Sequence, residues 1–227
     1  MSRPIPALSE QQMREVDRVM VEDLGIELMQ MMENAGRNLA ELALRRFRPA
    51  SVIVLAGPGG NGGGGLVAAR HLANRGVEVD VALSRPIDEF DGVPSRQLAI
   101  LEQMRIPLAH GAVTSADLVL DALIGYSLRG DPRGDTRDLI DWANESGTPV
   151  LSLDTPSGLD VTTGEAATPC IGATATMTLA LPKVGLLEAP QVGDLWLADI
   201  SVPPSVYRAF GIEIGNLFAE DTIIRVS

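Results

Sequence analysis

Hydrophobic residues near the start of the chain recur at helical spacing. Met13, Val16, Met20 and Leu24 follow one another every three or four residues, which places them on one face of a helix. A second apolar stripe runs through residues 27–47 and predicts a longer helix. We therefore expect the chain to open with two amphipathic helices, whose apolar faces could meet either the rest of the fold or a second subunit.

The start of the first helix carries a capping signal. Ser9 is followed three residues later by Gln12. This spacing matches the capping box, in which each of the two side chains binds the backbone N–H of the other residue. We therefore expect the first helix to begin directly after Ser9 and to end near Gly25.

Short apolar runs rich in β-branched residues follow the two helices. Such runs are typical of strands that are buried on both faces of a parallel sheet. They occupy residues 51–56, 77–83, 117–123, 149–153, 173–179 and 194–199. Helical segments are predicted between the first four of them, at residues 66–74, 95–104 and 136–146. Alternating strands and helices predict an α/β fold with a doubly wound sheet, which binds ligands beyond the carboxyl ends of its strands.

The composition is that of a globular protein, since 45% of the 227 residues are hydrophobic and 21% are charged. An α/β pattern of this length fits one domain over residues 1–227. Thirty acidic residues against 18 basic ones give a net charge of −12. This balance argues against a protein that binds nucleic acid through its phosphates.

The cysteine content and the lack of long apolar segments indicate where in the cell the protein is expected. The single cysteine, Cys170, excludes an internal disulfide framework and a cysteine-rich zinc site. No apolar run approaches the ~20 residues that a membrane-spanning helix needs. The first residues also lack the apolar segment of a secretory signal. The sequence therefore predicts a soluble, cytoplasmic protein without a membrane partner.

Residues 57–65 form the first of three loops that follow predicted strands. Seven of these nine residues are glycine. Glycine lets backbone N–H groups approach an anion closely, and the start of the following helix adds a partial positive charge. This loop is therefore a candidate for binding a phosphate group. The alternative is a flexible turn that binds nothing.

The second loop begins at Asp121, which ends a predicted buried strand. Glycine and basic residues follow, and Arg129 and Arg133 could meet a second phosphate. Two plainer interpretations stay open. The arginines could be solvated surface charges, and Asp121 could do no more than cap a nearby backbone N–H group.

The third loop begins at Asp154, which also ends an apolar strand. Pro156 and Gly158 give the following turn a fixed shape. A carboxylate held rigidly at the end of a strand is a candidate acid/base group or metal ligand. The alternative is an Asx-turn, in which the side chain only orders the loop.

Together the three loops bring Asn61, Asp121, Asp154 and Ser157 toward one crevice. Their side chains are hard oxygen ligands, which suit Na⁺, K⁺, Mg²⁺ or Ca²⁺ rather than a soft metal. Neither histidine is placed for catalysis, since one lies inside a predicted helix and His110 is expected in a loop. The motifs of serine hydrolases and zinc proteases are absent from the sequence.

The three loops, in this order and spacing, closely resemble the YjeF N-terminal domain family, whose characterised enzymes are NAD(P)HX epimerases. The likeness extends over residues 8–204. The segments that carry it are Met32-Glu-Asn-Ala-Gly36, Gly57-Pro-Gly59, Gly65-Leu-Val-Ala-Ala-Arg-His-Leu72, Asp121-Ala-Leu-Ile-Gly125, Asp154-Thr-Pro-Ser-Gly-Leu-Asp160 and Leu181-Pro-Lys-Val-Gly185.

The resemblance implies a Rossmann-like three-layer α/β/α fold with a mostly parallel central sheet. It also implies the substrate, NADH or NADPH hydrated at C6 of the nicotinamide ring. An isomerase of this family interconverts the R and S forms at C6, as part of nicotinamide nucleotide repair. A separate NAD(P)H-hydrate dehydratase would then act on the product.

The resemblance also assigns site residues. It places one potassium ion per subunit on Asn61, Asp121 and Ser157, and it places Asp154 beside the hydrated ring, as a catalytic and substrate-binding residue. The remaining substrate-binding positions are Gly60, Asn61, Gly62, Gly63, Gly64, Gly125, Tyr126, Ser127, Leu128, Arg129, Gly130 and Asp131. Lys183 matches a lysine of the family, and it has no assigned role.

Two residues depart from the family loop, which usually reads Asn-Asn-Gly-Gly-Asp-Gly. Gly60 replaces the first asparagine and Gly64 replaces the aspartate. If the missing carboxylate binds a ribose hydroxyl, affinity falls by about 1.5–3 kcal/mol, the usual range for a hydrogen bond to a charged group. If it braces the loop, the extra glycines raise the entropic cost of ordering that loop.

Inversion at C6 requires loss and return of the hydroxyl, and Asp154 is expected to move the proton.

Three alternatives to the epimerase function stay open. The chain could bind a ligand without turnover, since the family fold also occurs in non-catalytic settings, including scaffolds in mRNA decapping. It could be an NAD(P)-dependent dehydrogenase that uses the pattern GxGxxG at residues 57–62, or it could mainly bind a partner. The preference between NADHX and NADPHX, and the formation of a homodimer, also stay open.

Overall fold

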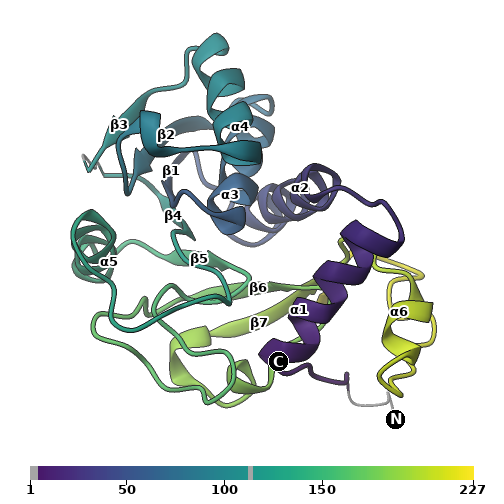
Figure 1. The fold of residues 1–227 in the computed structure, drawn as a ribbon. Coiled ribbons are helices and arrows are strands. Elements are labelled where there is room, and N and C mark those ends of the chain that lie inside the picture. The colour runs from purple at the N-terminus through teal and green to yellow at the C-terminus, as the bar shows by residue number, and fades with distance from the viewer. Residues whose placement is uncertain (1–4, 112–114) are drawn as a thin grey trace.

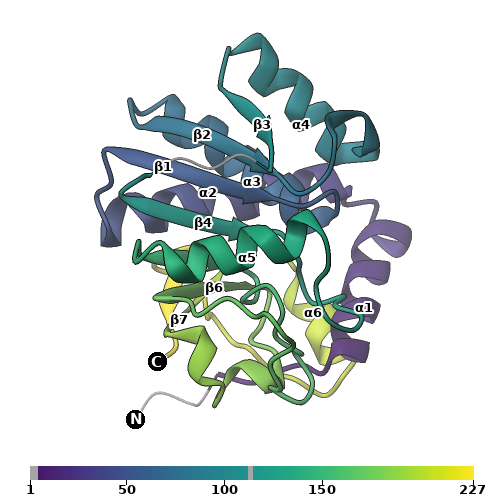
Figure 2. The same cartoon turned by 90° about the vertical axis from the view of Figure 1, so that its left-hand side faces the viewer.

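The computed structural model describes residues 5–111 and 115–227. The predicted single domain over residues 1–227 includes residues 1–4 and 112–114, which lie outside the described part. The centre of the molecule is one eight-stranded sheet with the order β3-β2-β1-β4-β5-β6-β7-β8. Every neighbouring pair is parallel except β7 and β8, which are antiparallel. Figures 1 and 2 show this sheet from two sides.

The elements have the following bounds. The strands are β1 Ser51–Ala56, β2 Glu78–Leu83, β3 Leu108–His110, β4 Leu118–Ala122, β5 Val150–Leu153, β6 Ala175–Leu179, β7 Asp194–Ala198 and β8 Ile223–Arg225. The α-helices are α1 Glu10–Arg18, α2 Leu28–Arg46, α3 Gly60–Ala73, α4 Gly92–Gln103, α5 Asp135–Glu145 and α6 Pro204–Arg208.

Helices cover both faces of the sheet. Helices α2, α3 and α4 lie on one side and α5 lies on the other (Figure 1). Strand β1 shows how the sequence achieves this. Val52, Val54 and Ala56 join the core that includes α2 and α3, whereas Ile53 and Leu55 join the core that includes α5. The predicted α/β fold with three layers and a mostly parallel sheet is therefore confirmed.

Helix α1 begins where the capping signal predicts. The Ser9 hydroxyl accepts a 3.2 Å hydrogen bond from the Gln12 N–H, and the Ser9 N–H donates to Gln12 Oε1 at 2.9 Å. The helix continues into a π-helical turn over Val19–Asp23, and the chain reverses at Gly25, whose φ is +69°. Helix α1 stands beyond the carboxyl ends of the strands (Figure 2).

The glycine-rich segment is where the prediction was wrong. We expected a loop up to residue 65, but residues 60–65 form the first turns of α3. None of the glycines from 57 to 65 has a positive φ. A side chain on Gly62 would lie 1.7 Å from the Gly57 carbonyl oxygen, and one on Gly65 would lie 2.5 Å from Ala122 Cβ. Gly62 and Gly65 thus allow α3 to pack closely on Gly57 and on β4, despite a helix-propensity cost of about 1 kcal/mol each.

Three further segments differ from the prediction. His110 was expected in a loop, but it ends β3, which pairs with β2. Helix α6 and strand β8 were not predicted. Strands of three residues offer too few positions for a periodic pattern, and their pairing is decided by the neighbouring strand.

The order of the strands creates a switch point. The chain leaves β1 for β2 on one side of the sheet, and it later returns to β4 on the other side of β1. Sheets of this type bind ligands in the crevice at the carboxyl ends of such strands. Within the described residues, no helix combines the length and apolar character needed to span a membrane.

Candidate active site

A cavity of about 520 Å³ lies at the switch point. Its walls come from α1, α2, the start of α3, the loop after β4, the end of β5 and Lys183. Seven of the predicted substrate-binding residues line it, namely Gly60, Asn61, Gly64, Gly125, Tyr126, Ser127 and Asp154. The fold thus brings segments that are far apart in the sequence to one cavity.

A second cavity of about 430 Å³ adjoins the first one. The two share Pro58, Leu123, Ile124 and Ser127 in their walls. The predicted residues Ser127, Leu128, Arg129, Gly130 and Asp131 line this second cavity, together with Arg85 and Arg133. Its three arginines make it a basic recess on a protein with a strongly negative net charge.

Gly62 and Gly63 line neither cavity. Gly62 packs on the backbone of Gly57, and a side chain on Gly63 would lie 2.6 Å from Met32 Sδ. Their predicted contact with substrate stays a prediction. What the structure shows for them is close packing inside the fold.

Asp154 lies at the carboxyl end of β5 in an unusual backbone conformation. Its φ is +66°, a left-handed value that few residues other than glycine adopt, although aspartate tolerates it. The side chain is buried, and one carboxylate oxygen accepts hydrogen bonds from the Lys183 ammonium and, at 3.3 Å, from the Leu179 N–H. Strained backbone of this kind is common at active sites, where surrounding contacts hold it in place.

Lys183 is the functional candidate to which the sequence assigned no role. It is 0% exposed, and its ammonium group donates to Asp154, to Thr178 Oγ1 at 3.2 Å and to the Leu179 carbonyl oxygen at 3.1 Å. Burying an ammonium group without a partner is very costly, so the ion pair with Asp154 accounts for its place in the interior. The Leu181-Pro-Lys segment was the signal in the sequence.

Asp121 and Ser157 lie in direct contact, as the sequence predicts. The Ser157 hydroxyl donates to Asp121 Oδ1 at 2.5 Å, and the Ser157 N–H donates to Oδ2 at 2.9 Å. Ser152 faces Asp121 across the β4–β5 pairing and adds a third hydrogen bond of 2.8 Å. Asp121 does accept from a nearby backbone N–H group, that of Leu123 at 3.3 Å, but capping alone is too narrow an interpretation, because its carboxylate also joins two strands and the third loop.

Asn61 lies in the first turn of α3, at the cavity wall. Its side chain packs against Gly125, since a side chain there would lie 3.4 Å from Asn61 Cβ. Its Nδ2 is buried and has no hydrogen-bond partner in the described part of the chain. An unpaired buried amide is uncommon, and it suggests a polar ligand at this position.

The predicted cation site around Asp121 stays a prediction. Asp121 is completely buried, and burial raises the pKa of its carboxyl group, although the hydrogen bonds from Ser157 oppose this. Residues 5–111 and 115–227 provide no ion pair for it. The same part of the chain shows no cluster of three or more His, Cys, Asp or Glu residues suited to a metal. The oxygens of Asp121 and Ser157 are hard ligands of the kind that hard cations prefer.

Gly60 and Gly64, the two departures from the family loop, sit in different surroundings. A side chain on Gly60 would only touch Met32 Cε, at 3.4 Å. A side chain on Gly64 would lie 2.7 Å from Leu153 Cδ2, inside the core. The missing asparagine therefore leaves room at the cavity, whereas the space for the missing aspartate is taken by Leu153.

Helix α1 contributes polar residues that sequence reasoning missed. Asp17 accepts a 2.5 Å hydrogen bond from the Tyr126 hydroxyl, and Arg14 lies over the Tyr126 ring at 5.6 Å from its centroid. All three line the larger cavity. The signal in the sequence was Asp17 itself. It lies four residues after Met13 and three before Met20, so its carboxylate falls on the apolar face of the predicted helix.

Comparison with known proteins identifies similar chains. Residues 28–185 match the family described as YjeF-related protein N-terminus. A protein of Dehalogenimonas lykanthroporepellens, called NAD(P)H-hydrate epimerase, is 47% identical over 208 residues, which cover 88% of this chain and 84% of that protein. A protein of Truepera radiovictrix with the same name is 39% identical, over 83% of this chain and 87% of its own.

Longer proteins and a solved structure are also similar. A bifunctional NAD(P)H-hydrate repair enzyme of Hyperthermus butylicus is 41% identical over 80% of this chain, but the match spans only 36% of that enzyme. The crystal structure of yeast ynu0 superposes with a TM-score of 0.84 at 24% identity, over 97% of this chain and 100% of the yeast chain. At that identity the structural likeness supports the fold.

Proposed function

Because this chain belongs to the YjeF-related protein N-terminus family, we propose that it is an NAD(P)H-hydrate epimerase, an isomerase that interconverts the R and S forms of NADH and NADPH hydrated at C6. The observation that carries this proposal is the buried Asp154–Lys183 pair in the cavity at the switch point. The pair supports the proposal because α/β sheets bind ligands at this position and a carboxylate there can act as an acid/base group.

Asp154 is the group that moves the proton at the hydrated ring. Its carboxylate is fixed by Lys183 and by its position at the strand end, and it lines the cavity. Loss of the C6 hydroxyl requires a proton on the leaving oxygen, and its return requires removal of a proton from water. A positioned carboxylate can perform proton transfer of either kind, with a usual gain of about 10²–10⁴-fold in rate.

The second cavity takes the phosphate-bearing part of the same substrate. Arg85, Arg129 and Arg133 supply positive charge there, and guanidinium groups bind phosphates in a bidentate manner. The shared wall lets one dinucleotide reach from this recess to Asp154. Arg129 and its neighbours could also meet the additional phosphate of NADPHX.

A potassium ion is the proposed partner of Asp121. Asn61, Asp121 and Ser157 would hold it, together ordering α3, the end of β4 and the third loop. When bound, the ion supplies positive charge beside the buried carboxylate and the substrate phosphates. The protein's own residues carry the proton transfer.

The product of this reaction would be the substrate of a second enzyme. An NAD(P)H-hydrate dehydratase that accepts one C6 form would consume the product and restore the cofactor. The bifunctional name of the Hyperthermus relative supports this link between the two activities.

The direct test follows the two C6 forms of hydrated NADH by chromatography, with purified protein in potassium chloride or in sodium chloride. We expect interconversion that is fastest in potassium. In water labelled with ¹⁸O, the exchanged form should acquire the label at C6, because the hydroxyl leaves and water returns. Interconversion without label would contradict that route.

A binding module without turnover is the second candidate, favoured by Gly60 and Gly64. Saturable binding of hydrated NADH with no interconversion above the background rate, in either salt, would support this module and overturn the epimerase.

A further inference from the structure

The cavity holds a second pair of polar side chains, apart from Asp154 and Lys183. Tyr126, in the loop after β4, donates its hydroxyl proton to Asp17 Oδ2 over 2.5 Å. Asp17 belongs to α1, 109 positions earlier in the chain. Both residues line the cavity. Asp17 reaches the cavity from α1, which stands beyond the carboxyl ends of the strands (Figure 2), whereas Asp154 reaches it from the end of β5.

The charged groups around this pair come from several elements. Arg14, on α1, lies over the Tyr126 ring, while Asp154 and Lys183 act on Asp17 from the end of β5 and from the segment after β6. Burial raises the pKa of Asp17, and the hydrogen bond from Tyr126 opposes this. Burial, and then the charge of Asp17, raise the pKa of Tyr126. Near neutral pH the tyrosine therefore keeps its proton, and Asp17 takes up a proton more readily than an exposed aspartate does.

The proposed reaction requires proton transfer on two sides of a ring. The hydroxyl leaves C6 from one face, and water must add to the opposite face for the configuration to invert. A single carboxylate on one wall reaches one face. The opposite face needs its own group within hydrogen-bond reach.

We propose that Asp17 and Tyr126 form a second proton-transfer pair, which serves the face of the hydrated ring opposite to Asp154. This inference rests on the proposed epimerase function. In one direction, the departing hydroxyl takes a proton from the Asp154–Lys183 pair, the C6–O bond breaks, and the ring nitrogen supplies an electron pair to give an iminium cation and water.

The return step uses the other wall. Water adds to C6 on the opposite face, and the electron pair returns to the ring nitrogen. The excess proton of the added water passes to the Tyr126 oxygen while the Tyr126 proton moves to Asp17. One water is lost and one is gained, one proton crosses from one pair to the other, and nothing is oxidised or reduced. The reverse epimerisation returns the proton.

The test uses Tyr126→Phe, Asp17→Asn and the double variant, assayed as the full chain in both directions of epimerisation. We expect each single variant to lower kcat at least 100-fold while KM changes less than about threefold, in line with loss of a proton-transfer group. The double variant should be no slower than the slower single variant, because both residues act in one relay. Asp17→Glu should recover part of the rate.

Tyr207→Phe is the matched control. Tyr207 is buried and lines neither cavity described above, and its hydroxyl has no hydrogen-bond partner in the described residues. This variant should keep the wild-type kcat and KM.

Two results would overturn the inference while leaving the epimerase in place. One is wild-type kcat in both Tyr126→Phe and Asp17→Asn. The other is a raised KM with unchanged kcat, which would mean that the pair only tethers α1 over the cavity. Failure of the wild-type protein itself to interconvert the two forms would instead overturn the proposed function, and this inference with it.

Discussion

At the scale of single residues, the central feature is a buried ion pair. Asp154 and Lys183 are 4% and 0% exposed, so each needs the other. Removing one partner of a buried pair typically costs about 3–5 kcal/mol, because it leaves an unpaired buried charge. Loss of activity and loss of stability therefore have to be separated at this site.

We expect Asp154→Asn to lower kcat by about 10²–10⁴-fold, since the amide keeps the shape but cannot take up the proton. It should also destabilise the fold by roughly 3–5 kcal/mol. The double variant Asp154→Asn, Lys183→Met should regain stability in urea unfolding without regaining activity. An active double variant would contradict the catalytic role of Asp154.

Gly60 and Gly64 should respond differently to substitution by alanine. Gly64→Ala should destabilise the fold by about 1–3 kcal/mol, because the new methyl group must displace the buried Leu153 side chain. Gly60→Ala is the matched control and should be neutral or stabilising, by up to about 1 kcal/mol, because alanine favours helix and only touches Met32. Urea unfolding measures both, and equal losses of stability would refute the distinction.

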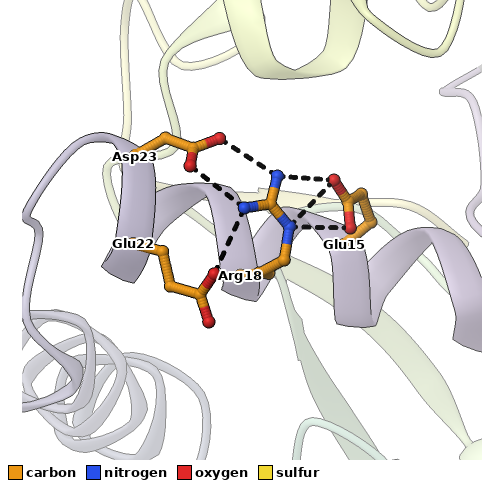
Figure 3. Close-up of polar contacts among 4 residues, drawn as sticks. All are labelled: Glu15, Arg18, Glu22 and Asp23. Atoms are coloured by element: carbon orange, nitrogen blue, oxygen red, sulfur yellow. Dashed lines mark hydrogen bonds and ion pairs between the residues drawn. The ribbon is translucent and has the colours of Figure 1, made fainter.

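At the scale of elements, α1 forms part of the cavity wall through Met13, Arg14 and Asp17. Beyond its capping box, Arg18 binds Glu15 within the helix and Glu22 and Asp23 in the following π-helical turn (Figure 3). These groups are exposed, so screening by salt weakens their contribution. The network joins the helix to the turn that leads to α2, and the buried apolar face of α1 supplies most of the attachment.

Ser9→Ala should weaken this element by about 1 kcal/mol, the usual cost of losing an N-cap. It should also raise KM, because α1 carries Arg14 and Asp17 to the cavity wall. Ser95→Ala is a suitable control, since that hydroxyl only donates to the Gly92 carbonyl of its own helix. A KM for hydrated NADH that stays at the wild-type value in Ser9→Ala would show that α1 does not shape the site.

At the scale of the whole molecule, the proposed potassium ion would connect three distant segments. A ligand that binds only the folded state stabilises it, by about 2.7 kcal/mol at a concentration 100 times its Kd. Thermal unfolding should therefore occur at a higher temperature in potassium chloride than in sodium chloride of equal concentration. Asp121→Asn and Ser157→Ala should each remove the difference, and a difference that persists in both would contradict the site.

The pattern of polar and apolar residues predicted most of this architecture. The alternation of short apolar runs with helical segments predicted the layers and the parallel sheet. Asp121, Asp154 and Ser157 were assigned to one crevice because parallel strands end at the same edge. Segments without a pattern of their own, such as β3 and β8, could not be predicted because the neighbouring strand decides their pairing.

The sequence by itself determined the order of the longer elements, the strand-end carboxylates and the likeness to an epimerase family. Tertiary structure alone decided that Gly62 and Gly65 of α3 serve close packing, that Lys183 is buried against Asp154, and that Asp17 of α1 contacts Tyr126. The physical reason is that periodicity reports which face of an element is apolar. Which two polar side chains meet depends on how separate elements pack, and that is not encoded in any local stretch of sequence.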